Sequence, residues 1–88
     1  MAKCPIRDRE VFAEMYPDTV LLDGFDNAII GITYNEEVIY SFEEMCNILM
    51  TRDGMSREEA EEYIDFNVEG TIRYIPAMAP IIMYEIQV

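Results

Sequence analysis

Residues 56–70 read SREEAEEYIDFNVEG, and this stretch decides the fold because it predicts an amphipathic helix. Ser56 and Glu59 have the spacing of a capping box, which marks the first turn of a helix. Gly70 is expected to end the helix. Apolar side chains recur along one side and are expected to face the core: Ala60, Tyr63, Ile64 and Val68. Asn67 is expected to lie on this buried side and to bond to backbone near Gly70.

The opposite side of this helix is acidic. Carboxylates recur there at i, i+3, i+4, i+7 and i+11: Glu58, Glu61, Glu62, Asp65 and Glu69. Like charges four residues apart destabilise an isolated helix by roughly a few tenths of a kcal/mol per pair. Either packing of the apolar side holds the helix, or the acidic stripe meets a cationic partner. The residues alone leave both possibilities open.

A second helix is predicted directly upstream. Ser41 and Glu44 form another capping-box pattern, and Gly54 is suited to the left-handed position after a helix. Between them, apolar residues follow the spacing of one helical face: Phe42, Met45, Cys46, Leu49 and Met50. Two capped helices with a short connection predict a helical hairpin.

The remaining elements are strands and one short helix. Residues 28–34 and 38–40 are apolar runs around a tight turn, which predicts a β-hairpin. Residues 19–22 form a β-prone run, and residues 81–88 are expected to add a last strand. A short helix over residues 7–16 is expected to end at Pro17. The chain is thus predicted to be α+β, with a small antiparallel sheet of three to four strands against the helical hairpin.

One face of this sheet is expected to lack a full cover. The residues expected on it are some of Ile29, Ile39, Tyr40, Ile82 and Tyr84. The helix over residues 7–16 is too short to cover a whole sheet face. Since a leftover apolar patch on a small domain often marks an interface, we expect a homo-oligomer, and a dimer in particular.

Composition narrows the class of protein. The 88 residues form one domain, 1–88, and a hydrophobic content of 51% is too high for a disordered chain. The net charge of −12 disfavours direct binding to nucleic acid and favours a basic protein partner. The first residues lack the apolar stretch of a signal peptide, and no run is long enough to span a membrane. A cytoplasmic location is therefore expected.

Catalysis and metal chemistry find little support. The chain has no histidine and two cysteines, so the usual zinc sites and any histidine base are excluded. Asp23 and Asp26, with Asn27, could offer oxygen ligands to Mg²⁺ or Ca²⁺, although their spacing is not that of an EF-hand. A turn with side-chain bonds to backbone is the alternative explanation. We expect no catalytic residue, no cofactor and no enzymatic activity.

Two blocks resemble a known group of proteins. Residues 23–31 read DGFDNAIIG, and residues 52–70 read RDGMSREEAEEYIDFNVEG. This order resembles a group of small acidic proteins encoded by bacteriophages, cyanophages among them, and by some bacteria. The resemblance covers about residues 17–84. It departs at residues 71–74, where relatives tend to have AYVG, and at Ala79, where they have threonine.

The resemblance implies a phage-type origin, which would place the protein in the cytoplasm of a host cell, but it implies no activity. Combined with the acidic stripe, it suggests a protein that binds a host nucleic-acid-binding protein by imitating a phosphate backbone. Two alternatives remain at this point. One is a structural or homo-oligomeric assembly protein whose charge only keeps it in solution, and the other is a small metal- or ligand-binding module that uses Asp23 and Asp26.

Overall fold

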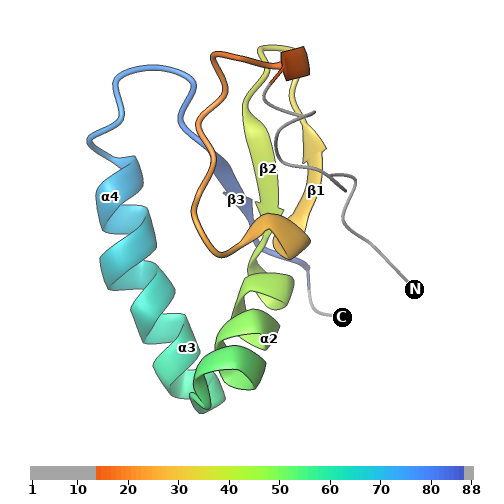
Figure 1. The fold of residues 1–88 in the computed structure, drawn as a ribbon. Helices are drawn as coiled ribbons and strands as arrows, with labels where there is room; N and C mark the ends of the chain where they lie inside the picture. Colours follow the sequence, from red (N-terminus) through yellow and green to blue (C-terminus); the bar gives the residue numbers. More distant parts are fainter. Residues whose placement is uncertain (1–13, 87–88) are drawn as a thin grey trace.

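The computed structural model describes residues 14–86 and has an α+β architecture (Figure 1). The predicted fold class is confirmed. In chain order, the elements are the 3₁₀ turn η1 (Asp26–Ala28), β1 (Ile29–Ile32), β2 (Val38–Ser41), α2 (Phe42–Asp53), α3 (Arg57–Tyr63), the π-helical segment η2 (Ile64–Glu69), α4 (Gly70–Ile72) and β3 (Ile81–Met83). Figure 1 shows α2 and the rod formed by α3, η2 and α4 as the two arms of a V beside the sheet. Of the helix predicted over residues 7–16, only residues 14–16 are described; Glu14 and Met15 are helical, and Tyr16 lies in a bend before Pro17.

The sheet has the order β1-β2-β3 and is mixed. β1 and β2 are antiparallel, as predicted, but β2 and β3 are parallel, so the prediction of a wholly antiparallel sheet is wrong. The reason is the path of residues 42–80, whose helices and loop carry the chain from the end of β2 back to the level where β2 begins (Figure 1). A connection of this length permits parallel pairing. Residues 19–22 form no strand; Leu21 and Leu22 instead pack against the core from a loop.

The core lies between the sheet and the helices. Its buried members are Phe25, Ala28, Ile29, Val38, Tyr40, Met45, Cys46, Leu49, Ala60, Ile64 and Val68. Among residues 14–86, Tyr40 has the largest fully buried side chain, and its hydroxyl accepts a hydrogen bond of 2.7 Å from the backbone N–H of Leu22. This bond ties the loop before η1 to the central strand.

The outer sheet face differs from the predicted one. Ile29 and Tyr40 are buried in the core, and Ile82 packs against it, so these three do not belong to the outer face. Alternation along the strands leaves other side chains there: Ile30, Ile39, Ile81 and Met83. Ile39 and Ile81 are cross-strand partners. The outer face is therefore apolar, and Ile30 and Ile81 are about 40% exposed (43% and 40%).

The N-terminus of α2 is held by two segments. The Ser41 hydroxyl accepts from the Glu44 N–H at 3.1 Å, as the sequence predicts. The carboxylate of Glu85, which follows β3, accepts from the Ser41 hydroxyl and from the Glu43 N–H. Negative charge at a helix N-terminus is stabilising, and the Glu85 carboxylate also satisfies a donor that the helix leaves unpaired. Glu85, in the segment after β3, thus helps to stabilise the N-terminus of α2.

The long helix does not end at Gly70, which has helical dihedral angles and leads into α4. Its core positions are spaced by four: Ala60, Ile64, Val68 and Ile72. In an α-helix, each step of four residues turns the side chain about 40° too far, because 3.6 residues complete a turn. The wider turns of η2 cancel this drift. The π-helical segment therefore keeps all four side chains toward the core.

Two glycines in the helices give a matched stability test. Gly54 ends α2 with φ of +69°, and Gly70 has a helical φ of −60°; a Cβ would have open space at both positions. Gly54→Ala is expected to lower the free energy of unfolding by about 1–2 kcal/mol because of backbone strain. Gly70→Ala is expected to raise it by about 0.5–1 kcal/mol because alanine is the better helix former. Urea denaturation measures both, and equal effects of the same sign would contradict these assignments.

Candidate functional site

The acidic helix begins at a complete capping box. The Ser56 hydroxyl accepts from the Glu59 N–H at 3.1 Å, and the Glu59 carboxylate accepts from the Ser56 N–H at 2.9 Å. This confirms the predicted start of the helix. It also satisfies two backbone N–H groups at the start of the turns where most of the acidic stripe lies.

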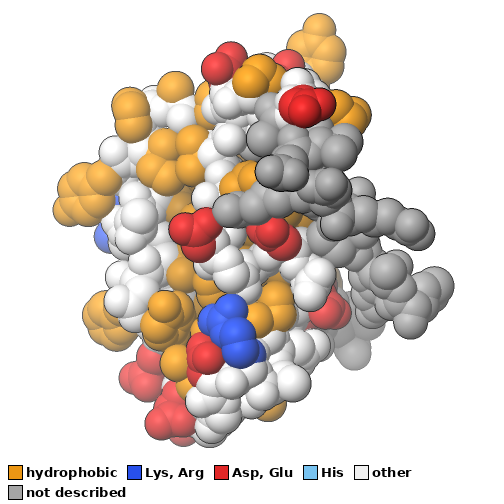
Figure 2. All heavy atoms as spheres, in the orientation of Figure 1, with side chains coloured by type: hydrophobic (Ala, Val, Ile, Leu, Met, Phe, Trp, Pro, Cys, Tyr) orange, Lys and Arg blue, Asp and Glu red, His pale blue; other side chains and the backbone are white. Residues whose placement is uncertain are grey.

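Four of the five predicted stripe residues share one surface. Together with Ser56 and Glu59, they line an open hollow along the helix: Glu58, Glu61, Glu62 and Asp65. Figure 2 shows acidic side chains gathered over the lower end of the V, where α3 begins. The helical spacing has brought these carboxylates together, as the sequence predicts.

Glu69 does not join this group. It lies at the end of η2, and its carboxylate accepts a hydrogen bond from the hydroxyl of Tyr84. Tyr84 in turn stacks on Phe42, with ring centroids 4.5 Å apart. Burial, and then the bond to Glu69, raises the pKa of Tyr84 to about 12. Glu69 therefore ties the long helix to the segment after β3.

Arg57 lies beside the acidic hollow and is already paired. Arg57 donates two bonds to the carboxylate of Glu43 on α2, at 2.9 and 2.8 Å, and one to Glu61 at 2.8 Å. These bonds raise the pKa of Arg57 and lower that of Glu43. Because Arg57 is shared between two acids, it neutralises only part of the stripe. Glu58, Glu62 and Asp65 are exposed and leave the hollow strongly negative.

A second hollow adjoins the acidic one and is called the apolar hollow here because Met55, Tyr63 and Phe66 contribute to it. It is lined by Met55, Glu59, Glu62, Tyr63, Phe66 and Asn67. Glu59 and Glu62 line both hollows and form the border between them. In Figure 2, hydrophobic side chains lie directly above the acidic group on the same face. The two hollows share Glu59 and Glu62; beyond this border the first is lined by further carboxylates, and the second by Met55, Tyr63, Phe66 and Asn67.

Three predicted placements on this helix need correction. Tyr63, which the sequence places in the core, is 37% exposed, and Asn67, which the sequence places on the buried side, is exposed. The bond near Gly70 is also different, since the Thr71 hydroxyl donates to the backbone carbonyl of Asn67. With core positions spaced by four, Tyr63 and Asn67 each fall one residue off the buried line. Phe66, which is 74% exposed, lies outside the predicted site, although its position off the apolar stripe was a signal for it.

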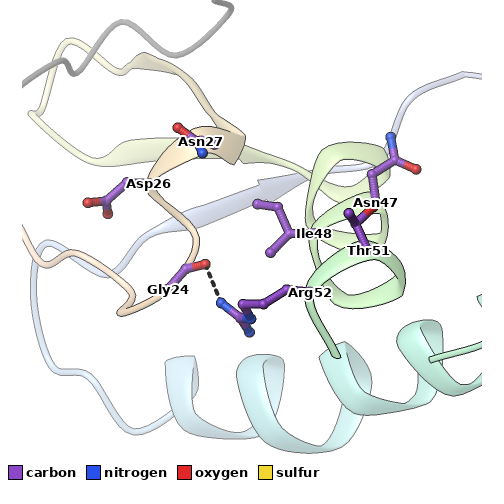
Figure 3. A pocket seen from close by; sticks show the side chains of 7 residues that line it. All are labelled: Gly24, Asp26, Asn27, Asn47, Ile48, Thr51 and Arg52. Atoms are coloured by element: carbon purple, nitrogen blue, oxygen red, sulfur yellow. Dashed lines mark hydrogen bonds between the residues drawn. The ribbon is translucent and has the colours of Figure 1, made fainter. Parts of the chain in front are cut away.

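The loop around Asp23 and Asp26 forms a separate hollow with α2. Its lining residues are Gly24, Asp26, Asn27, Asn47, Ile48, Thr51 and Arg52 (Figure 3). Arg52 donates to the Gly24 carbonyl at 2.9 Å and lies 5.8 Å from the centre of the Phe25 ring. Asp23 is exposed in the turn and does not line the hollow. An arginine thus fastens this loop to α2.

Residues 14–86 offer no further ligand to the metal site suggested for Asp23 and Asp26. Within residues 14–86, no three acidic, cysteine or histidine side chains lie close enough together to hold a metal ion. Cys46 is buried in the core, and burial raises the pKa of its thiol. A raised pKa lowers the thiolate fraction, which is the reactive form.

Comparison of the chain with protein-family models, with curated proteins and with solved structures gives no match. The resemblance to phage-encoded acidic proteins therefore stays a prediction. None of the helices within the described residues has the length and apolar character needed to cross a membrane.

Proposed function

We propose that this protein binds a basic surface of another protein through the acidic hollow of Glu58, Glu61, Glu62 and Asp65. The observation that supports this most directly is that these four carboxylates line one hollow, beside Arg57, which is shared with Glu43. The role is binding rather than catalysis, and it requires no cofactor.

The charge balance favours a cationic partner. The net charge is −12, and clustered carboxylates repel one another along the helix. A surface rich in lysine and arginine relieves this repulsion and is steered toward the hollow by the field of the whole protein. Surfaces of this kind are found on proteins that bind nucleic acids, because they must neutralise phosphates.

The partner class follows from the same chemistry. A row of carboxylates on a rigid helix can occupy a groove that normally receives a phosphate backbone. We therefore propose a phage-type modulator that competes with nucleic acid for such a groove in the host cytoplasm. The phage-type part of this proposal depends on the sequence resemblance alone.

A capture experiment tests the proposed binding. The protein is immobilised, exposed to bacterial lysate and washed with increasing salt, and the captured proteins are identified by mass spectrometry. We expect basic nucleic-acid-binding proteins that are released by salt, because screening weakens exposed charge interactions. The triple variant Glu58→Gln, Glu62→Gln, Asp65→Asn should lose them.

A matched control variant distinguishes the effect of removing charge from the acidic hollow from the effect of a lower total charge. The variant Glu14→Gln, Asp18→Asn, Glu36→Gln also removes three negative charges, but from exposed positions outside the long helix. It should keep the captured proteins. Equal capture by both triple variants, or capture of proteins without basic surfaces, would contradict the proposal.

A second candidate function is assembly through the outer sheet face. The observation that favours it is the apolar set of Ile30, Ile39, Ile81 and Met83 on adjacent strands. A homodimer would cover these side chains against a second copy. Sedimentation equilibrium checks this candidate, and Ile81→Lys should convert the dimer to a monomer. A monomeric wild-type protein would rule it out.

A further inference from the structure

We infer that the apolar hollow of Met55, Tyr63 and Phe66 receives one large apolar side chain from a basic peptide segment of the partner. The inference deepens the proposed function and depends on it. It specifies the kind of segment that binds: lysine or arginine residues around a tryptophan, phenylalanine or leucine.

The first support is the position of Phe66. It is 74% exposed, although Ala60, Ile64 and Val68 on the same rod are buried in the core. Its neighbours in the hollow are Tyr63, 37% exposed, and the half-buried Met55. Aromatic side chains and methionine are typical of the apolar centre of protein interfaces, and methionine adapts its shape to a partner.

The second support is the shared border of the two hollows. Glu59 and Glu62 line both, so a bound segment can place an apolar side chain against Phe66 and cationic side chains against these carboxylates. Arginine adds a further attraction because its guanidinium also binds aromatic faces. An apolar centre with a polar rim is the usual composition of a protein interface.

Charge favours a basic segment over other occupants of the apolar hollow. A second copy of this chain would bring another net charge of −12 toward the same carboxylates. Nucleic acid would bring phosphates, which are repelled in the same way. A cationic segment with an apolar anchor is complementary to both hollows.

Fluorescence anisotropy with two labelled peptides tests the inference. The first is a short lysine–alanine peptide with one central tryptophan, and the second has alanine in place of the tryptophan. We expect the wild-type protein to bind the tryptophan peptide about tenfold more tightly, since one buried aromatic side chain can supply such a factor. Phe66→Ala should remove this difference by weakening binding of the tryptophan peptide.

The control variant is Tyr34→Ala, which removes a fully exposed aromatic side chain from the turn between β1 and β2. It should keep the tenfold preference. Circular dichroism confirms that both variants fold, which is expected because both side chains are exposed. Equal affinity of the two peptides for the wild-type protein would overturn the inference while leaving the proposed function in place.

Other results discriminate further. A preference for the tryptophan peptide that survives Phe66→Ala would overturn the inference by placing the anchor elsewhere. Self-association that Phe66→Ala abolishes would overturn it in favour of a second copy. If neither peptide binds, both the inference and the proposed function fail.

Discussion

Tyr40→Ala is expected to lower the free energy of unfolding by about 3–5 kcal/mol, as for other large aromatic residues removed from a core. Tyr40 is fully buried at the centre of the sheet, and its hydroxyl accepts from the Leu22 N–H. Since small domains are stable by only about 5–15 kcal/mol, the variant should be close to unfolded at physiological temperature. Urea denaturation followed by circular dichroism measures the loss.

Tyr40→Phe separates the ring from the hydroxyl. Phenylalanine keeps the packing but leaves the Leu22 N–H without this acceptor, which should cost about 1–3 kcal/mol. A loss in Tyr40→Phe as large as that in Tyr40→Ala would mean that the hydrogen bond, and not the ring, dominates. A loss below about 0.5 kcal/mol in Tyr40→Ala would contradict the central position of this residue in the core.

The second large effect is expected from deleting one residue in α2. Removal of the exposed Asn47 turns every later residue of α2 by about 100°, because an α-helix advances 3.6 residues per turn. Leu49 would then leave the core, and the loss should reach at least the 2–5 kcal/mol, approximately, of a leucine-to-alanine change. Thermal and urea denaturation measure this loss.

Deletion of Asp65 is the matched control in the long helix. Asp65 is also exposed, but it lies in the π-helical segment η2. The turns of η2 are wider than those of an α-helix and match core positions that are four residues apart. Without Asp65, the core positions 60, 64, 68 and 72 acquire the spacing i, i+4, i+7, i+11 of a regular α-helix. We therefore expect a change of less than about 1 kcal/mol. If this deletion is as damaging as that of Asn47, the explanation given for η2 is wrong.

The parts of the fold that the sequence predicts are those with local causes. Ser41, Ser56 and Gly54 act through hydrogen bonds or dihedral angles within one or two turns, and the helix starts and the helix end predicted from them are confirmed. The same holds for the hairpin of β1 and β2, whose strands are neighbours in the chain. The α+β class follows from these elements.

The parts that could not be predicted depend on distant residues. The parallel pairing of β2 and β3 follows from the path of residues 42–80, which no local pattern encodes. The sheet face of Ile29 and Ile82 was ambiguous because apolar residues occur at successive positions in both strands. Gly70 was a poor stop signal, since its helical φ is open to any residue.

The candidate site divides in the same way. Helical spacing was enough to group Glu58, Glu61, Glu62 and Asp65. Helical spacing alone does not predict the hydrogen bond from the Tyr84 hydroxyl to Glu69, because Tyr84 follows β3 and is distant in the sequence. The bond from Arg57 to Glu43 joins two helices and was equally outside local reasoning.

The Glu85 carboxylate accepts hydrogen bonds from the Ser41 hydroxyl and the Glu43 N–H, so α2 is fully capped only after residue 85 has been synthesised. A nascent chain that has emerged only as far as α4 has one open edge on its central strand and an incompletely capped helix behind it. Neither defect is repaired until residues 81–85 leave the ribosome. The native fold is therefore reached after translation of its last strand, and a ribosome stalled before that point would display an exposed strand edge to the cell.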